Sequence, residues 1–298
     1  MVKPYEIRIK DGRIFILDQY SVLIYDSKTF KMIKTLCRRG EGPQEIKTFP
    51  RIELTDDKIF VTDNTKVIIY DRNFTYLKEY NMGKIVNRIV PIQENFVVSF
   101  QQDTGKDKFT VFLLYNSNMK ELKKLVLAPI PNDVSNILIS PWPKCRNWKD
   151  KVFISIPQKG FYIEIYDKNG SLLYKIEKKM NPVKAGEKHR KLVVDEWRYF
   201  LGRKLFNKVK ERGQTDIPIR DPLPLINNFW VFDDHIYVKT YHITDTAEKF
   251  VITDLKGNTI KSVFLPWTYK ELFTFDKERF YYLSESENEG WDLHCVDF

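Results

Sequence analysis

A pattern of short strands repeats six times along the sequence and limits the fold more than any other feature. Each copy has an apolar strand, a turn, a strand that ends in an aromatic residue and an acid, a polar turn, and a strand in which basic and apolar residues alternate. The copies occupy residues 13–36, 58–80, 95–115, 151–176, 235–264 and 279–296. Repeats of about 40 to 50 residues that contain several short strands are typical of β-propeller blades.

A further short strand precedes each copy, as in residues 51–54 and 136–139. Four strands per copy predict an all-β fold, a six-bladed β-propeller in which residues 1–298 form one domain and the first strand of each blade lines the central channel. Turn sequences such as Asp11-Gly12 separate the strands. A two-sheet sandwich is the alternative fold, but a sandwich does not require six similar copies.

One segment interrupts the repeats between the fourth and the fifth copy. Its apolar residues are spaced as on one face of a helix over about 187–211. This face consists of Val193, Trp197, Leu201, Leu205 and Val209. Gly202 interrupts the pattern, which is consistent with a kink or with two shorter helices. We therefore expect a helical insertion, about 184–220, between blades four and five.

The insertion is strongly basic, with nine Lys or Arg residues and four acids between Glu187 and Arg212. Three interpretations remain open: a solvated helix face, an anion-binding surface, or a lid over one face of the propeller, which its long flanks favour. Binding of nucleic acid is not expected, because the aromatic residues of the segment lie on its apolar side. The net charge of +9 indicates solubility and some affinity for polyanions, and nothing more specific.

Six aspartates recur at strand ends and resemble a set of metal ligands at first sight. They are Asp18, Asp26, Asp63, Asp71, Asp167 and Asp254. Because most of them precede a turn, we expect their carboxylates to accept hydrogen bonds from turn amides. The cysteines, Cys37, Cys145 and Cys295, are far apart and are expected to be free thiols. We expect no metal and no cofactor, and common catalytic motifs are absent from the sequence.

The sequence has no apolar run of the roughly 20 residues that a membrane helix needs. Residues 1–6 lead directly into a strand pattern and lack the apolar region of a signal peptide. The sixth copy stops after its third strand, so we expect the last blade to lack a fourth strand of its own and to expose an edge along residues 292–296.

Residues 39–46, with the sequence RGEGPQEI, resemble the G-x-G-P-G-E-F phrase of NHL-like propellers, although Gln44 and Ile46 differ from it. With the strand pattern, the whole chain resembles a bacterial group of six-bladed β-propellers. The resemblance implies an extracytoplasmic protein, periplasmic or with a lipid-anchored precursor. It also implies a longer natural chain, whose N-terminal strand completes the last blade. It implies little about activity.

In NHL-like propellers the connectors between blades and the turns between second and third strands share one face. The resemblance therefore implies a loop-rich, basic face carrying the insertion and candidate binding residues Arg38, Arg39, Lys84, Arg88, Gln101, Lys159, Tyr241 and His242. We expect a non-catalytic binding or scaffold protein whose partner is a protein, a peptide or a small anionic ligand. The alternative is a lactonase- or lyase-like enzyme with a central metal. A third interpretation of Arg38 and Arg39 is simple pairing with acids such as Glu41 and Glu45.

Overall fold

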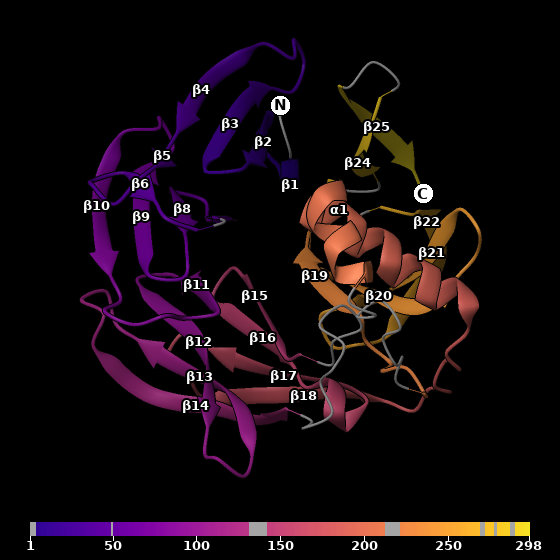
Figure 1. The fold of residues 1–298 in the computed structure, drawn as a ribbon. Coiled ribbons are helices and arrows are strands. Elements are labelled where there is room, and N and C mark those ends of the chain that lie inside the picture. The colour runs from indigo at the N-terminus through magenta and orange to yellow at the C-terminus, as the bar shows by residue number, and fades with distance from the viewer. Residues whose placement is uncertain are drawn as a thin grey trace.

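Six antiparallel sheets are arranged around a ring in the computed structural model of the protein (Figure 1). The structure describes residues 4–48, 50–130, 142–211, 221–268, 272–276, 279–286 and 290–298. The predicted six-bladed β-propeller with a helical insertion is confirmed. Within the described residues, no helix is both long enough and apolar enough to cross a membrane.

The strands follow one another in each sheet in the order of the sequence. The first sheet contains β1 (Pro4–Lys10), β2 (Arg13–Asp18), β3 (Ser21–Asp26) and β4 (Met32–Leu36). The second contains β7 (Arg51–Leu54), β8 (Lys58–Thr62), β9 (Lys66–Asp71) and β10 (Tyr76–Asn81). The third contains β11 (Arg88–Ile92), β12 (Asn95–Asp103), β13 (Lys108–Tyr115) and β14 (Glu121–Ile130).

The remaining three sheets come from the second half of the chain. The fourth contains β15 (Lys144–Trp148), β16 (Lys151–Ser155), β17 (Phe161–Asp167) and β18 (Leu172–Lys178), with a 3-10 turn at Pro157–Lys159. The fifth contains β19 (Asn228–Phe232), β20 (His235–Ile243), β21 (Ala247–Asp254) and β22 (Thr259–Pro266). The sixth contains β23 (Phe273–Asp276), β24 (Arg279–Glu285) and β25 (Trp291–Asp297). The strand expected at 136–139 lies outside the described residues, and β15 is the first strand of its sheet.

First strands of neighbouring sheets contact one another around the centre of the ring. β1 contacts β7 and β23, and β15 contacts β11 and β19. The first strands are therefore the innermost ones, as predicted. The described part of the sixth sheet has three strands, so β25 is its outermost strand. This agrees with the expectation that the last blade lacks a fourth strand of its own.

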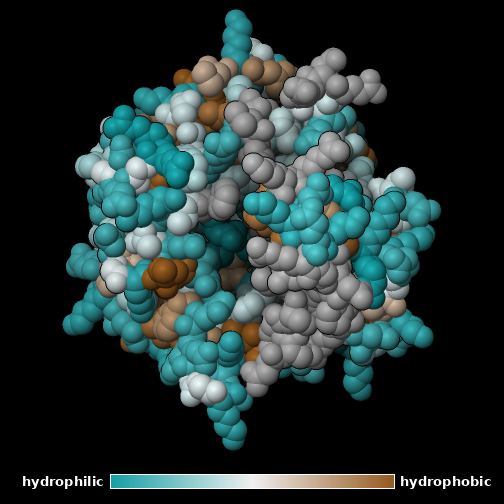
Figure 2. Space-filling model, viewed as in Figure 1, coloured by the Kyte–Doolittle hydropathy of each residue, from teal (hydrophilic) through white to brown (hydrophobic). Residues whose placement is uncertain are grey.

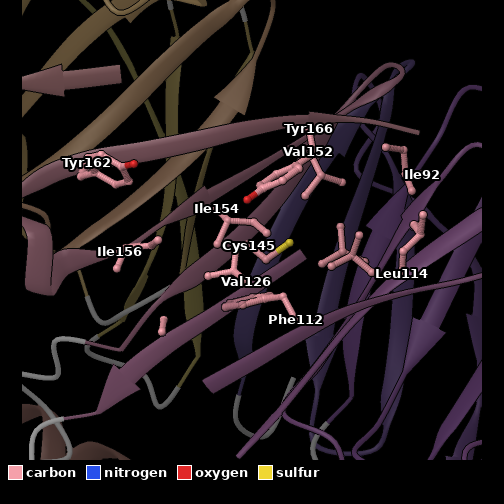
Figure 3. Packing of buried hydrophobic residues seen from close by; sticks show 13 residues of the cluster. Ile92, Phe112, Leu114, Val126, Cys145, Val152, Ile154, Ile156, Tyr162 and Tyr166 are labelled. Carbon is pink, nitrogen blue, oxygen red and sulfur yellow. The ribbon is translucent and has the colours of Figure 1, made fainter. Parts of the chain in front are cut away.

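Both sides of each sheet carry buried apolar side chains, because β2, β8, β12 and β16 are buried at four consecutive positions. Each of six apolar clusters joins two neighbouring sheets. Figure 3 shows the cluster in which Ile92, Phe112 and Leu114 of the third sheet meet Val152 and Ile154 of the fourth. A sheet covered on both sides needs two neighbours, and a closed ring supplies them to every blade.

Aspartates at the ends of third strands cap the turns that follow, as predicted. Oδ1 of Asp26 accepts hydrogen bonds from the backbone N–H groups of Lys28 and Thr29, at 3.0 and 2.8 Å. Asp71, Asp167 and Asp254 accept equivalent bonds in their turns. These carboxylates are therefore used locally, as turn caps.

The predicted helix forms α1 (Glu187–Glu211), but Gly202 divides it with a non-helical backbone at φ 72° and ψ 157°. The kink changes which residues face the propeller. Val193 is buried as expected, whereas Leu205 is 49% exposed and Phe206 is buried in its place. The interruption expected at Gly202 is confirmed, but the apolar face expected beyond it is wrong at Leu205, because the periodicity restarts at the kink. The described part of the helix contacts β20.

Helix α1 links the fifth sheet to the sixth and the first (Figure 1). Nδ1 of His189 accepts a hydrogen bond from the N–H of Gly186, so Nε2 carries the proton and donates to the carbonyl oxygen of Tyr241 at 2.8 Å. Farther along, the hydroxyl of Tyr199 donates to the carbonyl oxygen of Pro4 at 2.6 Å, and its ring meets that of Trp291 edge to face.

We predict that residues 186–220 can be replaced by a short Gly-Ser link without loss of the propeller. Val183 and Leu223 already pair as a β-bridge, so the two ends of the excursion lie side by side. The variant should keep a β-type circular dichroism spectrum and melt in one step at a lower temperature, because the contacts of Tyr199 and His189 are lost. Absence of a cooperative transition would show that α1 is part of the core.

We predict that one of the three thiols reacts rapidly in the native protein. Burial raises the pKa of Cys145 to about 12 and that of Cys37 to about 11, so both remain protonated near pH 8, whereas Cys295 is exposed. A colorimetric thiol assay should count one fast group in buffer and three in denaturant. The variant Cys295→Ser should remove the fast group, and a fast reaction in that variant would contradict this assignment.

Candidate functional site

Three segments on one face of the ring build a cleft over the second sheet. They are the connector from β4 to β7, the turn from β8 to β9, and the connector from β10 to β11. The cleft has a volume of about 370 Å³. It is lined by Gly40, Glu41, Glu45, Lys47, Asp63, Thr65, Lys66, Asn81, Gly83, Lys84 and Ile85. In an antiparallel sheet whose strands follow in order, connectors between blades and turns after second strands lie at the same end, which we call the loop face.

The wall of the cleft at residues 38–46 is held by Glu45. Two short strands, β5 (Arg38–Arg39) and β6 (Glu45–Ile46), pair in parallel there. Oε1 of Glu45 accepts from Nε of Arg38, and Oε2 accepts from the N–H of Gly42, both at 2.8 Å. A Cβ atom on Gly40 would lie 2.0 Å from Oε2 of Glu45, so a larger residue at this position would displace the carboxylate that holds the loop.

The floor of the cleft is a network around Lys66. Its ammonium group donates to the carbonyl oxygen of Gly42 at 2.8 Å and to Oε1 of Glu79 at 3.2 Å. Oε2 of Glu79 accepts from the N–H of Gln44 at 2.9 Å. Asp63 accepts from the backbone N–H groups of its own turn and of Lys47. Three of these contacts join the first connector to the second sheet and fix the walls of the cleft: Lys66 with Gly42, Gln44 with Glu79, and Lys47 with Asp63.

Two cations at the cleft rest on aromatic rings. The ammonium group of Lys84 lies 4.3 Å from the ring centre of Phe100 and 3.2 Å from the hydroxyl of Tyr115. The guanidinium of Arg39 lies 5.0 Å from the ring centre of Tyr20. Both residues are exposed. Aromatic support holds a cation in place and leaves its charge available to a second, anionic group.

Of the expected residues, Lys84 lines the cleft, and Arg38 and Arg39 form β5, directly before the lining residue Gly40. Simple pairing with a neighbouring acid, the third interpretation of the two arginines, applies to Arg38, which pairs with Glu45. Arg39 stacks on Tyr20. Gln101 is exposed beside Phe100, the residue that supports Lys84.

The other candidate residues lie elsewhere. Arg88 is on the innermost strand of the third sheet, where its guanidinium pairs with Glu53. Lys159 lies over the ring of Tyr162 in the fourth sheet. Tyr241 is buried at 3% exposure, beneath α1. His242 is exposed, but it lies within β20 and not in the loop expected from the sequence.

Sequence reasoning missed two residues of the cleft, Lys47 and Lys66. Both belong to segments that the resemblance assigns to the loop face, and their position directly after a connector or turn was the available signal. Lys47 pairs with Glu41 at 2.7 Å. The pairing of Lys66 with Glu79, a residue of the outermost strand, has no counterpart in the repeat pattern.

We predict a pH-dependent opening of the 38–46 loop. The N–H of Gly42 and then the guanidinium of Arg38 lower the pKa of Glu45 below its ordinary value of 4.5. The loop is therefore stabilised above that value, and the stabilisation is lost as the pH falls through the lower folded pKa. The amide signal of Gly42 in NMR spectra should titrate in this acidic range. In Glu45→Gln the titration should vanish, and its persistence would exclude Glu45 as the cause.

Comparison with known proteins supports the fold. The β-propeller domain of the Trilobed protease from Pyrococcus furiosus is 10% identical, with a TM-score of 0.51, over 98% of this chain and 92% of that domain. The acylaminoacyl peptidase of Pyrococcus horikoshii is 13% identical, with a TM-score of 0.52, over all of this chain and 51% of the peptidase. This chain therefore spans about half of the peptidase, and at such identities the likeness shows the fold alone. No curated protein matches the sequence significantly.

A sequence profile gives the family. Residues 1–177 match the profile of proteins described as 6-bladed beta-propeller, which is more than half of the chain. The six sheets around a ring agree with that description. This chain belongs to the 6-bladed beta-propeller family.

Proposed function

We propose that this protein is a non-catalytic binding or scaffold propeller that uses the cleft over its second sheet to hold an anionic group of a peptide, a protein or a small ligand. The observation that carries the proposal is the cleft itself, a space of about 370 Å³ with Lys47, Lys66 and Lys84 in its lining and Arg38 and Arg39 beside it. Residues 1–298 are proposed to act as one domain.

The charges of the cleft favour an anion over a cation. Four carboxylates of the site are already engaged: Glu41 by Lys47, Glu45 by Arg38 and the N–H of Gly42, Glu79 by Lys66, and Asp63 by the backbone N–H groups of Lys47, Thr65 and Lys66. Within the described contacts, Lys84 and Arg39 meet aromatic rings instead of carboxylates. An incoming carboxylate or phosphate would therefore find two supported cations whose charge is not already balanced locally.

The size and rigidity of the cleft favour binding of a side chain or a small ligand. The hydrogen bonds of Glu45, Lys66 and Asp63 fix its walls before any partner arrives, so little ordering cost is added on binding. The exposed rim adds charge steering, which raises the rate of encounter more than the final affinity. The resemblance of the whole chain to a bacterial group of six-bladed β-propellers supports an extracytoplasmic location as part of this proposal.

We predict that the double variant Arg39→Ala, Lys84→Ala weakens binding of a fluorescent acidic peptide by about five-fold to thirty-fold. Each exposed cation contributes on the order of 0.5–1 kcal/mol to such an interface. Fluorescence anisotropy at low ionic strength measures the affinity, and added salt should weaken the wild type more than the variant.

Lys28→Ala with Lys256→Ala is the matched control. Both residues are exposed and lie in turns after third strands, on the face opposite the cleft. The control removes the same charge and should bind the peptide as the wild type does. Equal losses in the two double variants would show that the effect is one of net charge, and would overturn the proposal for this cleft.

A further inference from the structure

Strand β25 occupies the place of a third strand in the sixth sheet. In four other sheets an aspartate that ends the third strand pairs with the first residue of the second strand. These aspartates are Asp26, Asp71, Asp167 and Asp254. Asp297 pairs in the same way with Arg279, the first residue of β24. Among the described residues, no strand pairs with the outer side of β25, so the sixth sheet is one strand short of the other five.

In each of the other five sheets, an apolar residue of the fourth strand lies opposite a buried apolar residue of the third strand. The register gives these pairs as Val22 with Leu36, Val67 with Tyr80, Phe112 with Val126, Ile163 with Ile176, and Phe250 with Val263. Both members of each pair belong to the apolar cluster shared with the next sheet, and the third-strand member is at most 1% exposed. The equivalent residue of β25 is Leu293, which is partly exposed.

The apolar cluster between the sixth and the first sheet is therefore incomplete on its outer side. Its partly exposed members include Leu23, Tyr25, Tyr281, Trp291 and Leu293. Leu293 and Trp291 share one side of β25 and face the first sheet. An apolar side chain opposite Leu293 would remove this surface from water, as Leu36 does for Val22 in the first sheet. The open edge and the open cluster thus lie at the same place.

The outermost strands of the other five sheets also have open edges, but their charge differs from that of β25. Each of them carries lysine, which opposes pairing with further strands; these lysines include Lys34, Lys78, Lys124, Lys175 and Lys261. Strand β25 carries no lysine or arginine. The described strands of the sixth sheet contain one arginine and four carboxylates, which are Arg279, Asp276, Glu285, Asp292 and Asp297.

The fourth strands also show which sequence the missing strand requires. In four of them a lysine stands two residues before the apolar residue of the pair, as Lys34 does before Leu36 and Lys261 before Val263. In the fourth sheet Lys175 directly precedes Ile176. The acidic sixth sheet complements such a lysine. The space beyond β25 therefore matches a strand with the order Lys-x-apolar.

The hydrophilic surface in Figure 2 surrounds a hollow at the centre of the molecule, whereas β25 is the outermost strand of its sheet. Its open edge is therefore far from the channel, and a partner can reach it from the outside of the ring.

We infer that the outer edge of β25 is a docking site for an extended, basic segment of a partner protein, with the order Lys-x-apolar. The segment adds to the sixth sheet as an antiparallel fourth strand, so backbone hydrogen bonds supply affinity and its side chains supply specificity. Its apolar residue lies opposite Leu293 and completes the cluster. Its lysine lies opposite Cys295, next to Asp297, because Lys34 and Lys261 occupy the equivalent positions in their sheets.

A second copy of the chain fits this edge less well than a basic partner. Two β25 strands that paired with each other would bring Asp292 and Asp297 of one copy towards the same residues of the other. Like charges on paired strands are destabilising. The charge of the edge therefore favours a lysine-containing strand from a different protein.

A fluorescent peptide with the sequence of residues 259–266, TIKSVFLP, tests the inference. It should bind the protein in a saturable way in fluorescence anisotropy and slow the reaction of the exposed thiol of Cys295 with a thiol reagent. Peptides that carry Lys261→Glu or Val263→Asp should bind at least about ten-fold more weakly. Because the chain has a net charge of +9, overall electrostatic attraction would not favour a basic peptide.

Variants of the protein locate the binding. Asp292→Lys with Asp297→Lys should weaken binding of the basic peptide by at least about ten-fold, because both exposed carboxylates of the edge become lysines. The matched control, Asp103→Lys with Asp107→Lys, makes the same change of charge at exposed positions around the turn from β12 to β13 and should bind as the wild type does. Arg39→Ala with Lys84→Ala should also bind normally, which separates this site from the cleft.

Three results would overturn the docking site: no saturable binding, an unprotected Cys295 in the complex, or equal losses in the two aspartate double variants. Dimerisation of the chain that the peptide reverses, measured by analytical ultracentrifugation, would assign the edge to a second copy instead of a partner. Loss of peptide binding in a chain extended by its natural upstream sequence would show that the edge is filled from within the chain, and would overturn the partner as well.

Discussion

Burial on both sides of every sheet is the constraint from which the rest of the structure follows. In β8 and β16, four consecutive side chains are buried, so apolar groups point to both neighbouring sheets. A single sheet cannot cover them, and a pair of sheets would leave two outer sides in water. The ring solves this with clusters such as the one that joins Phe112 to Ile154. The cleft lies outside these apolar clusters, at the segments that connect the strands on the loop face.

The sequence predicts those features that depend on neighbours within one blade. The repeated strand pattern identified the blades. The aspartates that end four of the third strands were recognised as turn caps, and Asp71 and Asp167 indeed accept from amides two and four residues away. The helix at 187–211 and its interruption at Gly202 followed from spacing alone. The residues buried after the kink did not, since the burial of Phe206 instead of Leu205 depends on the backbone conformation at Gly202.

Features that depend on contacts between blades were beyond the repeat pattern. Arg88 looked like a loop-face cation, but it begins an inner strand and meets Glu53 of the preceding sheet, 35 residues away. Tyr241 looked accessible, yet α1 covers it through His189, 52 residues earlier in the chain. Part of the cleft was predictable, because Arg38, Arg39 and Lys84 are all in connectors. The floor of the cleft was not predictable, because Lys66 contacts Gly42 and Glu79 only when the connector and the second sheet fold together.

The junction between the sixth and the first sheet differs mechanically from the others. At each of the five other junctions a segment of the chain connects the two sheets. Among the described residues, no segment connects β25 to the first sheet and no strand belongs to both. What joins them is apolar contact, with Leu283 and Trp291 against Ile9 and Leu23, and the tether of Tyr199 to Pro4. Among the described residues, the sixth and the first sheet are held together by side-chain contacts, so we expect the ring to be more compliant at this junction than at the other five.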